Sequence, residues 1–201
     1  MYKSSLTILE NRTVITVSGN DAKNFLQGLV TNDVDKVSEE NTIYTALLTP
    51  QGKYLHDFFI LKIGDKYYLD CEESRIEDLI RRLRMFKLRT NVIIELANEM
   101  CVIAMYGDRT IEVLSLTNSL GYSKPHVDGK IYTDPRLETI GARGIVPKTS
   151  IIELSENDRL KITPFESYDR LRISLGLPDS SRDMKIEKST LLESGFDELN
   201  G

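Results

Sequence analysis

An acidic residue interrupts one of the most apolar segments of this chain. Asp57 lies within residues 54–60 (YLHDFFI), where a charge on a buried face is costly unless it has a partner. The carboxylate could face solvent or pair with a nearby Lys or Arg. It could also lie at the base of a pocket and accept two hydrogen bonds from a ligand with adjacent N–H donors. Asp57 is therefore a candidate binding residue, with both interpretations open.

Basic residues are concentrated in one short segment, residues 81–89, at the predicted end of a helix. Cations there interact favourably with the helix dipole, so a solvated, stabilising cluster is one interpretation. A site for the carboxylate or phosphate of a ligand is the other. Arg172 poses a similar choice, because Asp169, three positions earlier, could be its structural partner. The basic residues of the cluster are Arg81, Arg82, Arg84, Lys87 and Arg89.

Other side chains that could do chemistry are sparse. The chain has two histidines, His56 and His126, which lie far apart, and two cysteines, Cys71 and Cys101, which form no C-x-x-C pair. We find no phosphate-binding glycine loop, nucleophile elbow or zinc-helix motif. The sequence therefore predicts no catalytic residue and no metal site. The cysteine usage fits a reducing compartment, and we expect a cytoplasmic protein.

The composition is that of a folded, soluble chain. Its 201 residues are 40% hydrophobic and 28% charged, which predicts one large domain or two small intertwined ones. The formal net charge of −5 makes nucleic-acid binding an unexpected function for the chain as a whole. No apolar run approaches the roughly 18 residues of a membrane span, so we expect no membrane partner.

Hydrophobic periodicity in the first half predicts a strand, a helix, a hairpin, a helix and a strand. The first helix is expected from residue 22 to about 31, capped by Asn20 or Asp21, and the second from Ser74, in a capping box with Glu77. This order is typical of the split β-α-β arrangement called ferredoxin-like. The predicted strands are residues 13–18, 42–48, 54–62, 67–69 and 91–97.

The second half repeats this alternation of strands and helices less regularly. Strands are predicted at residues 101–106, 130–133 and 141–146. Helices are predicted at residues 108–120 and 164–175, the latter with Thr163 and Glu166 as a capping box and Pro164 at its first position. The predicted fold is therefore α+β, with two intertwined ferredoxin-like-type units and antiparallel sheets. The first unit covers residues 1–98 and the second residues 99–201.

Six segments together resemble a known family. They occur, in the same order, in the folate-binding YgfZ/IBA57 family, which is related to the glycine cleavage T-protein, an aminomethyltransferase. The resemblance spans nearly the whole chain, and it implies the α+β fold of the folate-binding domain of that superfamily. The segments are residues 25–34 (FLQGLVTNDV), 46–53 (ALLTPQGK) followed by Asp57-Phe58, Arg82-Leu83 with 86–89 (FKLR), 134–137 (DPRL) with Gly141 and Arg143, Tyr168 to Arg172-Ile173, and 176–178 (GLP).

The resemblance implies an accessory factor for iron–sulfur cluster assembly or repair. Such a protein would bind tetrahydrofolate and contact assembly proteins or client apoproteins, without independent turnover. Asp57 matches the acidic position that contacts folate in aminomethyltransferases, and Arg172 matches a ligand-side arginine. Arg143, Arg172, or Lys87 and Arg89 would then meet the anionic glutamate tail of the folate.

The departures from the family pattern keep two alternatives open. Related proteins continue into a K-G-C-Y-x-G-Q-E motif after the segment that matches residues 191–201, and the second unit is expected to continue in the same way. Cys71 stands where aminomethyltransferases have an asparagine, and residues 136–143 (RLETIGAR) replace a segment with a glutamate that helps hold the substrate. An aminomethyltransferase is the first alternative. An RNA-binding module is the second, suggested by the element order and the basic cluster, although the chain has no RNP-like strand.

Overall fold

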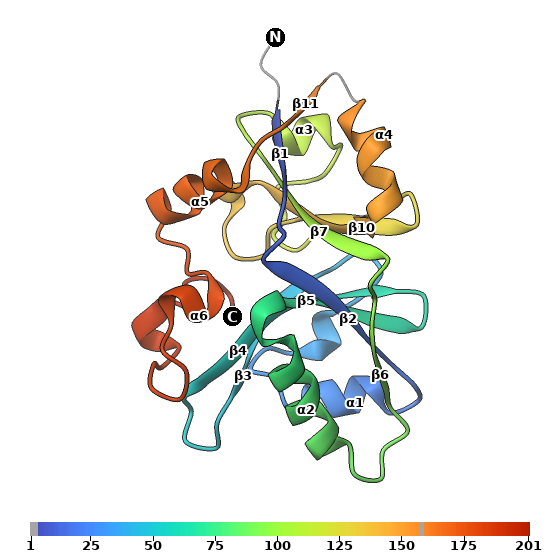
Figure 1. The fold of residues 1–201 in the computed structure, drawn as a ribbon, viewed down its shortest axis with the longest axis vertical. Coiled ribbons are helices and arrows are strands. Elements are labelled where there is room, and N and C mark those ends of the chain that lie inside the picture. The colour runs from blue at the N-terminus through green and yellow to red at the C-terminus, as the bar shows by residue number, and fades with distance from the viewer. Residues whose placement is uncertain (1–3, 157–158) are drawn as a thin grey trace.

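The computed structural model describes residues 4–156 and 159–201, and its strands form two sheets (Figure 1). The first sheet has five strands in the order β3-β4-β5-β2-β6, with antiparallel neighbours throughout. Strands β2 and β4 are parallel to each other with β5 between them, which is the predicted split β-α-β arrangement. The strands are β2 (Arg12–Ser18), β3 (Ile43–Leu48), β4 (Tyr54–Ile63), β5 (Lys66–Glu72) and β6 (Ile93–Leu96).

The second sheet has six strands in the order β11-β1-β7-β10-β9-β8. All pairs are antiparallel except β1 with β11. Because β1 lies in this sheet although it precedes β2 in the chain, the sheets interleave along the sequence. The division of the chain into domains at residue 98 stays a prediction. The strands are β1 (Ser4–Ile8), β7 (Met100–Tyr106), β8 (Ser123–His126), β9 (Gly129–Thr133), β10 (Ala142–Pro147) and β11 (Leu160–Ile162).

Each sheet has one face on the other sheet and one face on helices. In β4, Phe58 and Ile60 join the apolar cluster that also contains residues of α1 and α2, while Phe59 joins the cluster between the sheets. Since side chains alternate along a strand, Asp57 faces the second sheet together with Phe59. The four layers are therefore helices, sheet, sheet and helices, and the inter-sheet layer is where Asp57 lies.

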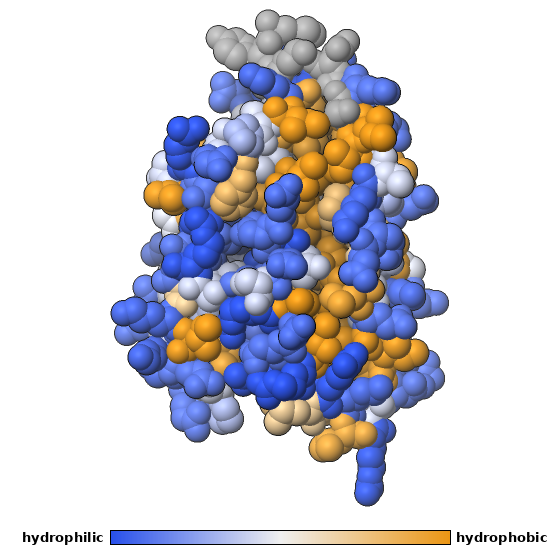
Figure 2. Space-filling view, in the orientation of Figure 1, coloured by the Kyte–Doolittle hydropathy of each residue, from blue (hydrophilic) through white to orange (hydrophobic). Residues whose placement is uncertain are grey.

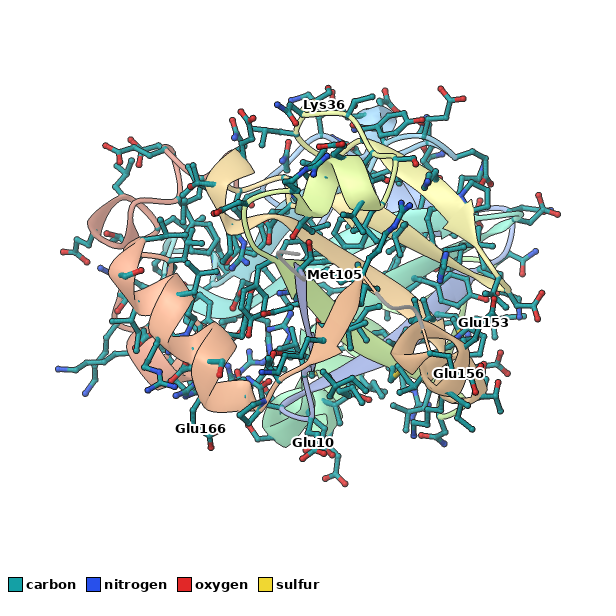
Figure 3. The ribbon with its side chains drawn as sticks, turned by 90° about the horizontal axis from the view of Figure 1, so that it is seen from above. Glu10, Lys36, Met105, Glu153, Glu156 and Glu166 are labelled. Carbon is teal, nitrogen blue, oxygen red and sulfur yellow. The ribbon has the colours of Figure 1, made fainter. Side chains whose placement is uncertain are left out.

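The helices occupy the outer layers and one side of the molecule (Figure 1). Helix α1 (Ala22–Gln27) and α2 (Ile76–Lys87) cover the first sheet, and α3 (Thr110–Val113) and α4 (Ile151–Ser155) cover the second. Helix α5 (Phe165–Ser174) and α6 (Ser180–Asp183) lie beside the sheets, on the left in Figure 1. In Figure 3, Met105 lies inside the molecule, whereas the labelled glutamates and Lys36 lie at its periphery. None of the helices in residues 4–156 and 159–201 has the length and hydrophobicity of a membrane-spanning segment.

The predicted helix at residues 108–120 is wrong. Only Thr110–Val113 is helical, and Ser115 adopts a positive φ of 52°. Leu114 and Leu116 are both buried in the same outer core of the second sheet. Residues two positions apart lie on different sides of a helix, so a continuous helix cannot bury both. Their burial breaks the helix at Ser115.

None of the three predicted helix caps forms, and two of them are replaced by tertiary contacts. The carboxylate of Asp21 accepts a hydrogen bond from the Asn91 backbone N–H at 2.7 Å and gives α1 no side-chain cap. Ser74 lies in a 3-10 turn and donates to Glu72, so the predicted capping box is absent. Thr163 donates to the Leu6 carbonyl, which ties β11 to β1, so the Thr163 side chain does not cap α5.

Strands β8 and β11, which periodicity did not predict, are short and lie at the two edges of the second sheet.

Candidate functional site

Charged side chains occupy the layer between the two sheets. Asp70 in β5 is fully buried, and its Oδ1 accepts a hydrogen bond from Arg12 Nε at 2.6 Å. Its Oδ2 accepts from Arg143 Nη2 at 2.5 Å. Burial by itself raises the pKa of Asp70, but the charges and hydrogen bonds of Arg12 and Arg143 outweigh it and hold that pKa below its usual value. Because Arg143 belongs to β10, this ionised carboxylate links the two sheets.

Asp57 lies in the same layer, so of the open interpretations the one in which it faces solvent is excluded. Its carboxylate is buried and accepts a hydrogen bond from the Tyr54 hydroxyl at 2.7 Å and one from the Tyr44 hydroxyl at 2.9 Å. No Lys, Arg or His of the described residues forms an ion pair with it. Burial, and then the charge of Asp57, raise the pKa of both tyrosines, so they remain neutral donors. Asp57 is thus a buried acceptor held in place by two neutral hydroxyls.

Two arginines cover the aromatic ring beside Asp57. The guanidinium carbon of Arg143 lies 4.3 Å from the Phe59 ring centroid, and that of Arg136 lies 4.9 Å from it. Arg136 also forms two hydrogen bonds to the Asp134 carboxylate, at 3.0 and 2.8 Å. Arg143 Nε is buried without an acceptor among the described residues. A carboxylate, an aromatic face and a guanidinium with an unused N–H therefore meet in one place.

Gly141 fixes the start of the strand that carries Arg143. Its φ is +99°, and a Cβ there would lie 2.5 Å from the Met105 carbonyl oxygen of the neighbouring strand. A side chain is therefore excluded on both conformational and steric grounds. This close approach sets the register of β10 against β7, in which Arg143 lies opposite Ala104 of the inter-sheet core.

The cavity at this cluster is small. Its volume is about 20 Å³, enough for about one water molecule, whereas pockets for small ligands usually measure about 300 to 1,000 Å³. The C-terminal segment covers the same core: Phe196 is buried and stacks on Tyr44 with ring centroids 4.9 Å apart, and Asn200 donates to the Pro135 carbonyl. The cavity is lined by Arg12, Asp57, Phe59, Arg136, Arg143 and Arg172, together with residues from the start of the chain, α5 and the α5–α6 connection.

Arg172 lines this cavity and also holds the α5–α6 connection. Its Nε donates to Asp169 Oδ1 at 2.6 Å, which confirms the predicted structural partner. Its Nη1 donates to Asp183 Oδ2 at 2.5 Å and to the Leu177 carbonyl at 3.0 Å. Arg172 therefore already has anionic partners on both sides of the turn that follows α5.

The structure brings three of the five predicted ligand residues together. Asp57, Arg143 and Arg172 line one cavity. Lys87 is the last residue of α2 and Arg89 follows two positions later. Helix α2 packs on the outer face of the first sheet, so the sheet separates this segment from the Asp57 carboxylate.

Sequence reasoning missed Asp70 and Arg12, which form the centre of the cluster. The sequence does contain a signal for Asp70, because this charge interrupts the apolar strand 67–71 (YYLDC) in the same way as Asp57 interrupts its own strand. A charge on the inward face of a strand requires a partner. Which residues supply that partner depends on how the second sheet packs, and Arg143 lies far away in the sequence.

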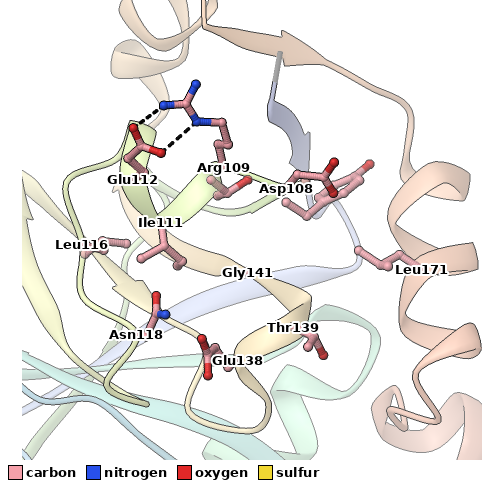
Figure 4. A pocket seen from close by; sticks show the side chains of 13 residues that line it. Asp108, Arg109, Ile111, Glu112, Leu116, Asn118, Glu138, Thr139, Gly141 and Leu171 are labelled. Carbon is pink, nitrogen blue, oxygen red and sulfur yellow. Dashed lines mark hydrogen bonds and ion pairs between the residues drawn. The ribbon is translucent and has the colours of Figure 1, made fainter. Parts of the chain in front are cut away.

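A wider groove lies elsewhere on the molecule (Figure 4). It measures about 820 Å³ and lies between α3, the 138–141 turn and α5. Its rim carries the exposed carboxylates of Asp108 and Glu138 and an Arg109–Glu112 ion pair with a 2.8 Å hydrogen bond. None of the residues predicted to bind a ligand lines it. We favour the inter-sheet cluster as the functional site because its ionisable groups are buried and paired, whereas those of the groove are mostly solvated.

Comparison with known proteins identifies the family. The GCVT N-terminal domain family matches residues 6–126, which is more than half of the chain. The chain belongs to this family. The crystal structure of the glycine cleavage system aminomethyltransferase T from Bartonella henselae has a TM-score of 0.73 to this chain at 17% identity, covering 89% of this chain and 52% of that one. The predicted α+β class with antiparallel sheets is thereby confirmed as the fold of the glycine cleavage T-protein.

Relatives in the family carry two kinds of name. A Neurospora crassa protein named iron–sulfur cluster assembly factor IBA57 homolog, mitochondrial, is 28% identical over 209 residues, covering 99% of this chain and 47% of the relative. An aminomethyltransferase of Thermoanaerobacter is 26% identical over 207 residues, covering 91% of this chain and 55% of the relative. The chain thus spans about half the length of the curated relatives that it matches.

The expected cytoplasmic location is contradicted by these comparisons. Four relatives from Neurospora crassa, Mycosarcoma maydis, Pyricularia oryzae and Dictyostelium discoideum are all named as mitochondrial proteins. The expectation rested on cysteine usage, which separates oxidising from reducing environments and does not tell one reducing compartment from another.

Proposed function

We propose that this chain is the tetrahydrofolate-binding part of an accessory protein for iron–sulfur cluster assembly. Its relatives named as assembly factors, and its membership of the GCVT N-terminal domain family, support this function. The mitochondrial names of those relatives make mitochondria the location to test. The observation that carries the ligand assignment is Asp57, a buried carboxylate at the inter-sheet cavity with neutral donors and no cation paired to it.

The donor set of the cluster fits a reduced pterin with an acidic tail. Asp57 can accept from adjacent N–H groups of the ring, since a carboxylate offers two oxygens and the tyrosine hydroxyls can turn to other acceptors. Phe59 also lines the cavity, but Arg143 and Arg136 cover its ring, so the ring would meet a ligand only after one of these arginines shifts. Arg143 has an unused Nε–H for an anionic group, and Arg172 would contact one only after leaving Asp169 or Asp183. When bound, tetrahydrofolate supplies a carrier for one-carbon groups.

Binding requires the cavity to widen, because about 20 Å³ does not accommodate a pterin ring. The elements that border the cavity at the surface are α5 and the α5–α6 connection, which Arg172 fastens through Asp169 and Asp183. These elements, and the C-terminal segment around Phe196, are therefore the parts that must move. We assign no folate contact to Lys87 and Arg89, since the first sheet lies in between.

Calorimetric titration of tetrahydrofolate into the chain tests this proposal. We expect Asp57→Asn to weaken binding by about tenfold or more, because a charge-assisted hydrogen bond contributes roughly 1.5 to 3 kcal/mol. Asp65→Asn, at an exposed position in the β4–β5 turn, is the matched control and should bind like the unchanged chain. An unchanged affinity in Asp57→Asn would remove Asp57 from the site. An absence of binding to a folded, unchanged chain would refute the proposal for these 201 residues.

Aminomethyl transfer is the second candidate function, favoured by the Thermoanaerobacter relatives. Residues 136–143 (RLETIGAR) argue against this function. Arg136 binds Asp134 and Arg143 binds Asp70, so both side chains belong to the inter-sheet cluster. Formation of methylenetetrahydrofolate from an aminomethylated carrier protein decides between the two functions. No product above background is expected for an accessory factor.

A further inference from the structure

An apolar surface is exposed at the end of α2 and along β6. Met85, Phe86 and Leu88 are 62, 54 and 89% exposed, and Leu96 in β6 is 45% exposed. Scattered exposed apolar side chains are ordinary, whereas a continuous patch with a polar rim marks an interaction surface. In Figure 2, hydrophobic and hydrophilic side chains lie side by side at the lower end of the molecule, where α2 ends. We name this patch, with Arg81 and Arg84, the α2–β6 surface.

The surface is concave and basic. A groove of about 590 Å³ runs between α2 and β6, lined by Glu77, Ile80, Arg81, Arg84, Met85 and Leu96, so two arginines and one glutamate face it. Residues 81–89 contain five basic and no acidic residues, although the chain has a net charge of −5. Of these, Arg81 and Arg82 form ion pairs with Asp78.

The remaining cations of this segment take no part in the ion pairs of the described residues. Among residues 4–156 and 159–201, no carboxylate forms an ion pair with Arg84, Lys87 or Arg89. Unpaired cations around an apolar groove are complementary to a ligand that has acidic and apolar groups together.

Strand β6 offers a second means of recognition. It lies at the end of the first sheet, and among the described strands it pairs with β2 alone, so its outer edge is open. Unpaired N–H and C=O groups of an edge strand can pair with an extended segment of another chain. Leu96 and the buried Ile94 project to the same side of the sheet as α2, so a segment added to β6 would run beside the groove.

We propose that the α2–β6 surface binds an acidic, extended segment of a partner protein. The segment pairs with the open edge of β6, inserts an apolar side chain between Met85 and Leu96, and places its carboxylates at Arg84 and the neighbouring cations. A lipid surface matches this shape less well, because the groove is concave and a membrane cannot pair with the strand. A second copy of this chain is disfavoured, because a two-fold contact through β6 would bring two basic clusters together.

A short synthetic peptide that alternates Glu and Val, labelled with a fluorophore, is the probe. Fluorescence anisotropy of the peptide is measured with the unchanged chain, and amide shifts of the isotope-labelled chain locate the contact. We expect binding that shifts the amides of β6 and the end of α2, and that is lost for the same peptide with Lys in place of Glu. Arg84→Glu should weaken binding by about tenfold or more, and Leu96→Ser should weaken it without a change of charge.

Lys66→Glu is the matched control, because it changes the net charge by the same amount at an exposed position in β5. Equal weakening by Lys66→Glu and Arg84→Glu would show that only net charge matters, and would overturn the proposal. Amide shifts confined to other elements, or no binding at about millimolar peptide, would also overturn it. Binding to phosphatidylserine vesicles that Arg84→Glu abolishes, without peptide binding, would replace the protein partner by a membrane. Folate takes no part in these assays, so their outcome is independent of the proposed function.

Discussion

Replacing Asp70 with asparagine tests whether the inter-sheet ion pairs hold the two sheets together. Asparagine keeps the size of the side chain and one acceptor oxygen. It removes the charge that faces Arg12 at 2.6 Å and Arg143 at 2.5 Å, and it turns an amide donor toward one of the two guanidiniums. Two buried cations then lose their shared counter-ion, and removing one partner of a buried pair is strongly destabilising.

The expected loss is about 3 kcal/mol of unfolding free energy, at the low end of the roughly 3 to 5 kcal/mol typical of such changes. The low end applies because both arginines keep other acceptors. Arg12 also donates to the Asp70 carbonyl and to Ser180, and Arg143 donates to the Tyr168 hydroxyl at 3.0 Å. For a chain of this size, a loss of about 3 kcal/mol lowers the melting temperature by about 6 to 12 °C.

Urea unfolding at neutral pH, followed by circular dichroism, measures this loss. Since the folded pKa of Asp70 lies below its usual value, the contribution is complete above that value and is lost only as the pH falls below it. Asp65→Asn, in the exposed turn, should leave stability unchanged. Adding Arg143→Met to Asp70→Asn should cost less than the sum of the single losses, because it removes one of the two uncompensated cations. A loss below about 1 kcal/mol for Asp70→Asn, as for a surface pair, would refute the reasoning.

Two further predictions concern stability. Phe196→Ala should lower the unfolding free energy by about 3 to 5 kcal/mol, because Phe196 is buried and stacked on Tyr44. Leu192→Ala, at an exposed position, should leave it almost unchanged in the same urea assay. Equal losses in the two variants would contradict the packing of the C-terminal segment. Burial and the charge of Arg75 lower the pKa of His56 to about 4. The unfolded chain therefore binds a proton at His56 before the folded chain does, and the unfolding free energy should fall by about 3 kcal/mol as the pH drops from 6.5 toward 4. His56→Gln should lose this contribution to the pH dependence. Identical pH profiles of the two chains would show that His56 is not the group responsible.

His56 also shows why a contact must be interpreted with its environment. Its Nε2 lies 2.9 Å from Asp78 Oδ2, a distance compatible with an ion pair. With its pKa lowered to about 4, the imidazole is neutral near pH 7, and the contact is a hydrogen bond from a neutral ring. Asp78 takes its compensating charge from Arg81 and Arg82 on its own helix.

The sequence by itself predicted the elements whose signal is local. Strand β2, the β3–β4 hairpin, β5, α2 and β7 all follow from alternation, helical periodicity and turn residues within the segment concerned. The same local logic singled out Asp57, because a charge inside an apolar strand stands out without knowledge of the fold. It failed at residues 108–120, where helical periodicity was outweighed by the joint burial of Leu114 and Leu116.

Only the tertiary structure decided which partners these residues have. Asp57 is held by two tyrosines of its own sheet and by no cation, whereas Asp70 receives the arginines, one of them from a strand far away in the sequence. Lys87 and Arg89 lie on the far side of the first sheet from Asp57, although the family resemblance had grouped them. Periodicity determines which face of an element a side chain occupies, but not which face of another element it meets, because packing between sheets brings together residues with no fixed spacing along the chain.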